Sequence, residues 1–171
     1  MRALLEIMQF EIRYQLRSPF FLGALLMFAL IHFLSFTGVV NIGDISNQVA
    51  INRAYAILNA ELALFIFGML PILAFVSTAM TRDFEYATAS LIYVTPIPPR
   101  NFVLGRFLGA LSLALLISLA GLLVAMIGAF MPWLDQARIA PFTPAPWVYI
   151  FLVFILPNTF VISAIFFSVA A

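Results

Sequence analysis

The chain contains no cysteine and no lysine, and it has one histidine, His32. Without cysteine there is no disulfide framework and no thiolate metal site. A Walker loop needs a lysine after its glycines, and a two-histidine zinc helix needs a second histidine. The sequence therefore excludes a conventional ATPase in this chain, and we expect it to have no catalytic, metal or cofactor site.

Charge is also scarce. Only 9% of the 171 residues are charged, while 65% are hydrophobic, whereas a soluble domain has roughly 25% charged residues. A helix that crosses the bilayer needs roughly 20 apolar residues. Four runs without Asp, Glu, Lys or Arg are long enough, at 18–40, 62–81, 107–134 and 146–171. The composition therefore indicates an integral membrane protein.

These runs predict helices, because backbone groups in lipid must be paired within a helix or a closed barrel. The apolar runs are continuous, without the alternation of barrel strands. Residues 1–18 are charged and amphipathic, which argues against a cleaved signal peptide. We therefore expect an all-α polytopic membrane protein. Its parts are an interfacial helix over 1–18 and a transmembrane domain over 19–171, with spans at about 19–40, 62–81, 107–134 and 147–171.

Arginine predicts the orientation. Six arginines lie before the first span or between the second and third, and two lie in the other connections. Because positive residues favour the cytoplasmic side, we expect the N-terminus and the 82–106 loop to be cytoplasmic. Trp133, Trp147 and Tyr149 then fall at the outer interface, where amphipathic rings prefer to lie.

Residues 1–17 predict a helix on the membrane surface, with polar residues on one face and apolar residues on the other. Ser18 and Pro19 predict an N-cap and first position for the next helix. Glu11 and Gln15 break the pattern, because they project from the apolar face. Either both side chains reach the lipid headgroups, or they contact the protein's own cytoplasmic loop, with Glu11 pairing with Arg82 or Arg106.

The loop 82–106 is charged and interrupted by prolines, and it lies between two membrane-length runs. Such a loop is where a membrane protein can contact a soluble partner. Asp83 and Glu85 could form an acid and base pair, but a water-facing loop favours solvated or arginine-paired roles. The residues that we assign to partner contact are Arg82, Asp83, Glu85, Tyr86, Thr95, Pro96, Arg100 and Arg106.

Few polar residues lie within the spans. His32 is the ionisable residue deep in an apolar run, and such residues are candidates for function. Either it is a neutral imidazole bonded to a neighbouring helix, or it belongs with Asn158 to a transport path. Pro71 and Pro157 each remove an amide and predict kinks. Small residues along the third span, including Gly105 and Gly109, predict close helix packing.

Several segments together resemble one family. They are Arg82–Glu85 with Ala87-Thr88, Thr95-Pro96-Ile97, Val103–Ala110, Phe10-Glu11 with Tyr14–Pro19, Asn52–Tyr55, Met131–Asp135 and Leu156–Asn158. Their order and topology are similar to those of ABC-2 type transporter permeases. The likeness is greatest to the subgroup whose longer members carry an aminopeptidase-like domain.

The resemblance implies a permease subunit that dimerises and binds a separate ATP-binding subunit, without nucleic acid. It also implies an N-terminal helix on the cytoplasmic membrane face, at residues 1–17, and a coupling helix at about 84–94 that transmits ATPase motion. Ala87 stands where the family commonly has glycine. The family usually has six spans whereas this chain has four, so we expect an N-terminal piece of a longer permease.

The expected function is therefore that of a permease in an ATP-driven transporter of the plasma membrane, acting as an exporter. Two alternatives belong to other classes of protein. One is a membrane scaffold or anchor for a fused soluble domain, which would need no ATPase. The other is a membrane-embedded enzyme, which would require a convergent polar cluster inside the bundle.

Overall fold

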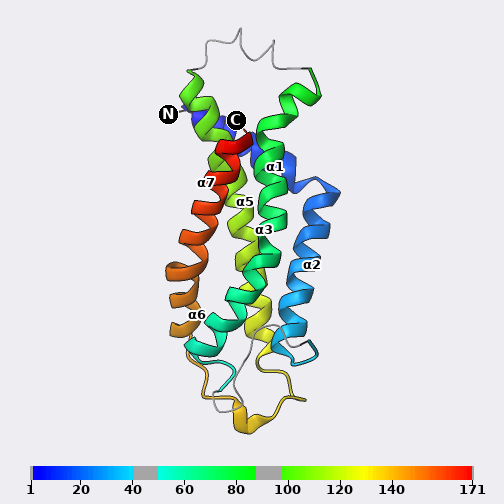
Figure 1. Cartoon of the computed structure of the whole chain (residues 1–171), viewed down its shortest axis with the longest axis vertical. Coiled ribbons are helices and arrows are strands. Elements are labelled where there is room, and N and C mark those ends of the chain that lie inside the picture. The colour runs from blue at the N-terminus through cyan, green and yellow to red at the C-terminus, as the bar shows by residue number, and fades with distance from the viewer. Residues whose placement is uncertain (1, 41–49, 88–97, 171) are drawn as a thin grey trace.

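A computed structural model describes residues 2–40, 50–87 and 98–170, apart from the side chains of residues 83–85. All the secondary structure in these ranges is helical (Figure 1). Its elements are α1 (Arg2–Leu16), α2 (Pro19–Phe36), α3 (Ala54–Glu85), α5 (Pro99–Gly128), a 3-10 turn (Gln136–Arg138), α6 (Ala145–Ile150), a π-helical segment (Phe151–Ile155) and α7 (Leu156–Ala170). Four stretches are long and apolar enough to span a membrane: Pro19–Phe36, Ala54–Arg82, Pro99–Gly128 and Ala145–Ala170. The protein is therefore an all-α polytopic membrane protein.

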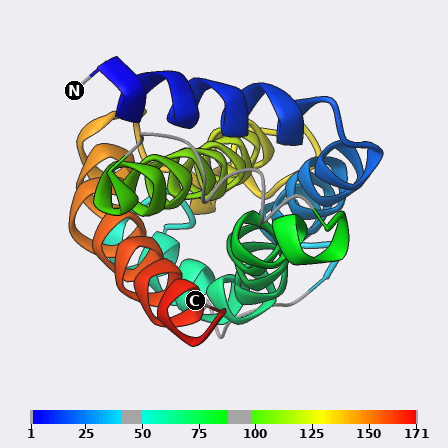
Figure 2. The same ribbon diagram turned by 90° about the horizontal axis from the view of Figure 1, so that it is seen from above.

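The four long helices form an up-and-down bundle, and α1 lies across one end of it (Figure 2). We call this the α1 end. Helix α5 is central to the packing, because it contacts α1, α2, α3 and α7. The end of α3, the start of α5 and the end of α7 all lie at the α1 end (Figure 1).

The boundary between α1 and α2 agrees with the sequence. The Ser18 hydroxyl accepts a hydrogen bond from the Phe20 amide at 3.2 Å, and Pro19 occupies the first turn of α2. At its other end α2 stops at Phe36, before the predicted limit of residue 40. Gly38 has a φ of +72° there, a conformation that glycine adopts at little cost, so the chain leaves the helix early.

The helices α3 and α5 differ from the expected spans. Both begin eight residues earlier than predicted, at Ala54 and Pro99. Helix α3 also continues through Glu85, so residues 84 and 85, which the sequence assigned to a coupling helix at about 84–94, belong to the last turn of α3. The rest of that predicted helix, from Thr88 onward, lies outside the described residues. The apolar runs marked the lipid-exposed part of each helix, and helices continue beyond that part.

The last span accommodates its proline through a π-helical segment. Pro157 has no amide hydrogen to donate, and the turns before it widen so that the Leu156 amide bonds to the Phe151 carbonyl. The Asn158 side chain then donates to the Phe154 carbonyl at 2.7 Å. The Asn158 side chain thus provides a hydrogen-bond donor to a carbonyl of the π-helical segment. This bond gives Asn158 a structural role within its own helix.

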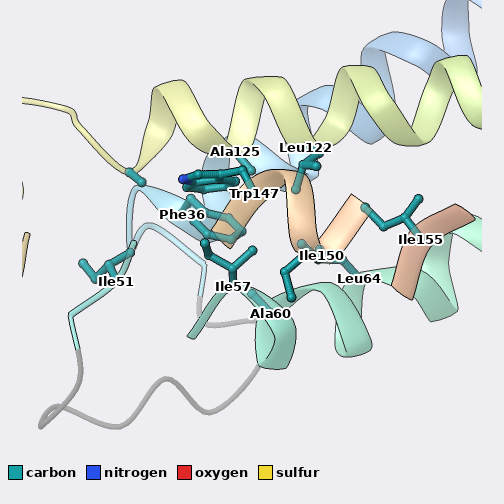
Figure 3. Close-up of a cluster of buried hydrophobic side chains, with 11 residues drawn as sticks. Phe36, Ile51, Ile57, Ala60, Leu64, Leu122, Ala125, Trp147, Ile150 and Ile155 are labelled. Atoms are coloured by element: carbon teal, nitrogen blue, oxygen red, sulfur yellow. The ribbon is translucent and has the colours of Figure 1, made fainter. Parts of the chain in front are cut away.

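The largest apolar cluster among the described residues joins the end of α2, the start of α3, the end of α5 and the start of the last span (Figure 3). It therefore lies toward the end of the bundle opposite α1. Trp147 packs there against Phe36 at a ring-centroid distance of 5.7 Å, and only 4% of its surface is exposed. The sequence placed Trp147 in an aromatic belt, and this is wrong because the side chain belongs to the core. Trp133 and Tyr149 are exposed, as residues of such a belt would be.

Candidate functional site

Helix α1 lies directly on α5 because two glycines allow the close approach. A Cβ atom at Gly109 would lie 2.6 Å from the Cβ of Glu11, and one at Gly105 would lie 2.9 Å from the Cβ of Ile7. Both distances are shorter than side chains tolerate. The spacing of four residues places both glycines on the same face of α5. The small-residue pair noted in the sequence, Gly105 and Gly109, is thus the surface of α5 against which α1 packs. We call this surface the seat of α1.

An ion pair fixes α1 to α3 at this seat. Arg82 donates to Glu11 through both terminal nitrogens, at 3.2 Å to Oε1 and 2.8 Å to Oε2. Glu11 is fully buried and Arg82 is 5% exposed. The two residues are 71 positions apart in the sequence. This is the pairing that the sequence predicted for Glu11, with the first of the two proposed partners.

Gln15 completes the contact one turn farther along α1. Its amide nitrogen donates to Glu11 Oε1 at 2.5 Å and to the Phe75 carbonyl of α3 at 3.4 Å. Of the two roles considered for Glu11 and Gln15, contact with the protein's own groups is therefore the one observed. We refer to Glu11, Gln15 and Arg82 as the α1–α3 clamp.

Two rings of α1 cover the guanidinium of the clamp. The Arg82 Cζ atom lies 4.2 Å from the ring centroid of Tyr14 and 5.8 Å from that of Phe10. Arginine is suited to such a position, because its planar group can bind a carboxylate and stack on aromatic faces at once. A hydrogen bond with the Tyr86 side chain raises the pKa of Tyr14 above its ordinary value of 10.0. The Tyr14 phenol therefore stays neutral at physiological pH.

Arg106 is a second arginine turned into the protein. It is 5% exposed, its Nη1 donates to the Ala79 carbonyl of α3, and its Cζ lies 4.6 Å from the Phe102 ring centroid. The sequence placed Arg82 and Arg106 in a surface for a partner. In the structure, both guanidinium groups are buried and bind acceptors on other helices of this chain. Buried donors need such acceptors.

The remaining residues assigned to partner contact lie in and around the same connection. Tyr86 is 65% exposed just after α3, and Arg100 is exposed in the first turn of α5. Asp83 and Glu85 belong to the last turn of α3, and their side chains lie outside the described part. Thr95 and Pro96 also lie outside the described residues. The described members thus divide into two buried arginines and two exposed residues.

A second ionisable pair lies inside the bundle, and the sequence revealed only half of it. His32 of α2 is fully buried, and its Nε2 lies 3.5 Å from Oε2 of Glu61 in α3. His32 Nδ1 donates to the Phe28 carbonyl at 2.8 Å, because a carbonyl can only accept. Gly121 makes room for the ring, since a Cβ there would lie 3.1 Å from His32 Cε1.

Glu61 was overlooked because it directly precedes the apolar run 62–81, where it looked like a loop residue. A signal was available. Small and apolar residues recur at Ala56, Ile57, Ala60 and Leu64, which is the spacing of a buried helix face. That pattern extends the helix upstream and carries Glu61 inside. The structure therefore gives His32 a buried acidic neighbour, and neither His32 nor Asn158 lines the groove described below.

The described residues contain no cluster of three or more His, Cys, Asp or Glu side chains that could hold a metal ion. The clamp ties α1 to the last turns of α3, close to the point where the described part of α3 ends.

No family model matches the chain, and no curated protein matches it either.

Proposed function

We propose that this chain is the membrane-spanning permease part of an ATP-driven transporter of the ABC-2 type. The observation that carries the proposal is the α1–α3 clamp. It supports the proposal because a permease driven by a separate ATPase needs a rigid link between its cytoplasmic connection and its membrane helices. Here α1 and α3 are held by a buried bidentate pair of 2.8 and 3.2 Å directly before residues 86–98.

In this proposal the α1 end faces the cytoplasm of the cell that bears the protein in its plasma membrane. The connection 86–98 contacts an ATP-binding subunit, and Asp83, Glu85 and Tyr86 lie at its start. The protein acts as an exporter and pairs with a second permease copy. The arginine distribution supports this orientation, because Arg2, Arg13, Arg17, Arg82, Arg100 and Arg106 all belong to the N-terminal segment or to this connection.

The test replaces Asp83 and Glu85 with alanine in the full-length protein. Membrane insertion, co-purification of an ATPase subunit and transport-linked ATP hydrolysis are then measured. We expect normal insertion, with weaker co-purification or with hydrolysis that is no longer linked to transport. The matched control replaces Glu6 and Asp135, which are exposed acidic residues elsewhere in the chain, and it should leave all three measurements unchanged.

The scaffold hypothesis makes the opposite prediction. A membrane anchor needs no ATPase, so deletion of residues 86–94 should leave its role intact. If ATPase binding and coupled hydrolysis persist after that deletion, the permease proposal fails and the scaffold becomes the better description.

A further inference from the structure

A groove with a polar part and an apolar part lies between α1, α2 and α3. The polar part has a volume of about 790 Å³, and its walls include Arg13, Gln15, Arg17, Ser18, Phe20 and Phe75. The apolar part has a volume of about 300 Å³, and it is lined by Phe20, Gly23, Ala24, Met27, Leu70 and Pro71. Phe20 belongs to both walls, so the two parts adjoin.

The direction of the helices orders the two parts by depth. Helix α2 leaves the α1 end at Pro19, so Gly23 and Met27 lie progressively farther from that end. Helix α3 approaches the α1 end, so Leu70 and Pro71 are deeper than Phe75. Phe20 and Met27 are separated by about 10 Å along the axis. The polar part therefore lies at the level of the lipid headgroups, and the apolar part lies at the level of the acyl chains.

The polar part carries positive charge that is not neutralised within the described protein. Arg13 near the end of α1 and Arg17 just after it are exposed one turn apart, and neither forms an ion pair with another described residue. Both line the polar part of the groove. The groove is thus suited to an anion.

We propose that this groove binds one phospholipid with an anionic headgroup of the phosphatidylglycerol type. Its phosphate lies against Arg13 and Arg17, and one acyl chain lies along Gly23, Met27 and Pro71. Phosphatidylethanolamine and phosphatidylcholine fit less well, because the cationic group of either headgroup would lie beside two guanidinium groups.

The bound lipid contacts the side of α1 that the α1–α3 clamp does not fix. The α1–α3 clamp fixes one side of this helix, whereas the Arg13 and Arg17 side faces the groove. A phosphate between α1 and the start of α2 would join the helices on either side of the Ser18 turn. Occupancy of the groove should therefore stabilise the docked position of α1.

The test measures lipid retained by the purified protein. The protein is delipidated in detergent, supplied with phosphatidylglycerol, phosphatidylethanolamine or phosphatidylcholine, and examined by native mass spectrometry. We expect phosphatidylglycerol to be retained most strongly. The paired substitution Arg13→Gln and Arg17→Gln should weaken its retention by about tenfold or more, since each arginine near an anionic surface contributes on the order of 1 kcal/mol.

A second variant tests the apolar part. Gly23→Leu should place a side chain in the apolar part of the groove, since nothing lies within 4 Å of a Cβ at this position, and it should also lower retention. The matched control is the pair Arg2→Gln and Arg53→Gln, which removes equal charge at two exposed positions outside the groove.

Three results would overturn the proposal. One is equal retention of the three lipids by the native chain. Another is an equal loss in the Arg13 and Arg17 variant and in its control. The third is an effect of only one of the two groove variants, because a single bound lipid requires both parts. Each variant is first checked for an unchanged elution profile and thermal midpoint in lipid-free detergent.

Discussion

In the structure, Arg82 contacts side chains of α1. From its place in a charged loop, it was expected to contact a partner. Its guanidinium binds Glu11 through two nitrogens and lies over the rings of Tyr14 and Phe10. A buried charge of this kind is tolerated because two of its nitrogens bind the opposite charge of Glu11 and its face stacks on rings. The geometry of the group, and not only its charge, is therefore what the site requires.

Arg82→Lys tests this requirement. Lysine keeps the charge but loses the bidentate fork and the stacking, so we expect a loss of roughly 1–3 kcal/mol in unfolding free energy. The measurement is thermal or denaturant unfolding in detergent. Arg100→Lys at an exposed position is the control and should change stability by less than about 0.5 kcal/mol. Equal effects of the two substitutions would show that charge alone matters at Arg82.

Ala87 stands just after α3 with a φ of +53°, a left-handed conformation that costs a residue with a Cβ roughly 1–2 kcal/mol. Glycine removes that strain but loses more backbone entropy on folding. We expect Ala87→Gly to raise stability by about 0.5–1 kcal/mol. Ala63→Gly within α3 should lower it by about 1 kcal/mol. Destabilisation by both would mean that the strain at residue 87 is negligible.

Individual residues differ in how far the sequence predicts their positions. Glu11 was predictable, because a carboxylate on the apolar face of an amphipathic helix needs a cation. Glu61 was not singled out, since at the edge of an apolar run it looks like a loop residue. Trp147 was wrongly predicted to lie at the membrane interface, because a large ring with a polar atom suits both the interface and the core. Which of the two it occupies depends on how the neighbouring helices pack around it.

At the scale of elements, α1 and α5 form the closest helix crossing described above. Gly105 and Gly109 let the backbone of α1 approach α5, and this approach brings Glu11 within reach of Arg82. The spacing of the glycines was visible in the sequence, but their partner was not. Two small residues four apart indicate a contact face and carry no information about which helix fills it.

Gly109→Ala should displace α1. The added Cβ would lie 2.6 Å from the Glu11 Cβ, so the helix must shift and the ion pair must lengthen. We expect a loss of roughly 1–3 kcal/mol and faster proteolysis near residues 13–17. Gly23→Ala is the control, because its Cβ meets open space and alanine favours helix by about 1 kcal/mol. Unchanged stability and proteolysis in Gly109→Ala would contradict the crossing.

The helices α3 and α5 are longer than the apolar runs that predicted them, because hydropathy detects only the apolar part of a helix. Apolar runs located all four spans, because lipid contact demands apolar surface. They missed the first eight residues of α3 and of α5, because each of these segments contains at least one charged residue. Glu61 in α3 and Arg106 in α5 are nevertheless buried against other helices.

At the scale of the whole molecule, α1, the end of α3, the start of α5 and the end of α7 lie on the same side of the bundle (Figure 1). The arginine asymmetry predicts that this side is cytoplasmic. The absence of native cysteine allows a direct test with single cysteines at Ser46 and Ser90, both of which lie outside the described residues.

With an impermeant thiol reagent on intact cells, we expect labelling at position 46 and none at position 90 until the cells are opened. A cysteine at Ser168, near the end of α7, serves as a second position for the α1 side and should behave like position 90. Labelling of position 90 but not of position 46 on intact cells would reverse the orientation.

The position of α1 also has a consequence for biosynthesis. It packs against residues of α3 and α5, and the Glu11–Arg82 pair joins positions 71 residues apart. When α1 leaves the ribosome, the residues of α3 and α5 that it contacts have not yet been synthesised. Until they are, the Glu11 carboxylate stays hydrated at the membrane surface. Docking of α1 becomes possible only once Gly109 has been synthesised and α5 has been inserted. Helix α1 is therefore made before the helices against which it packs, and it reaches its final position after them.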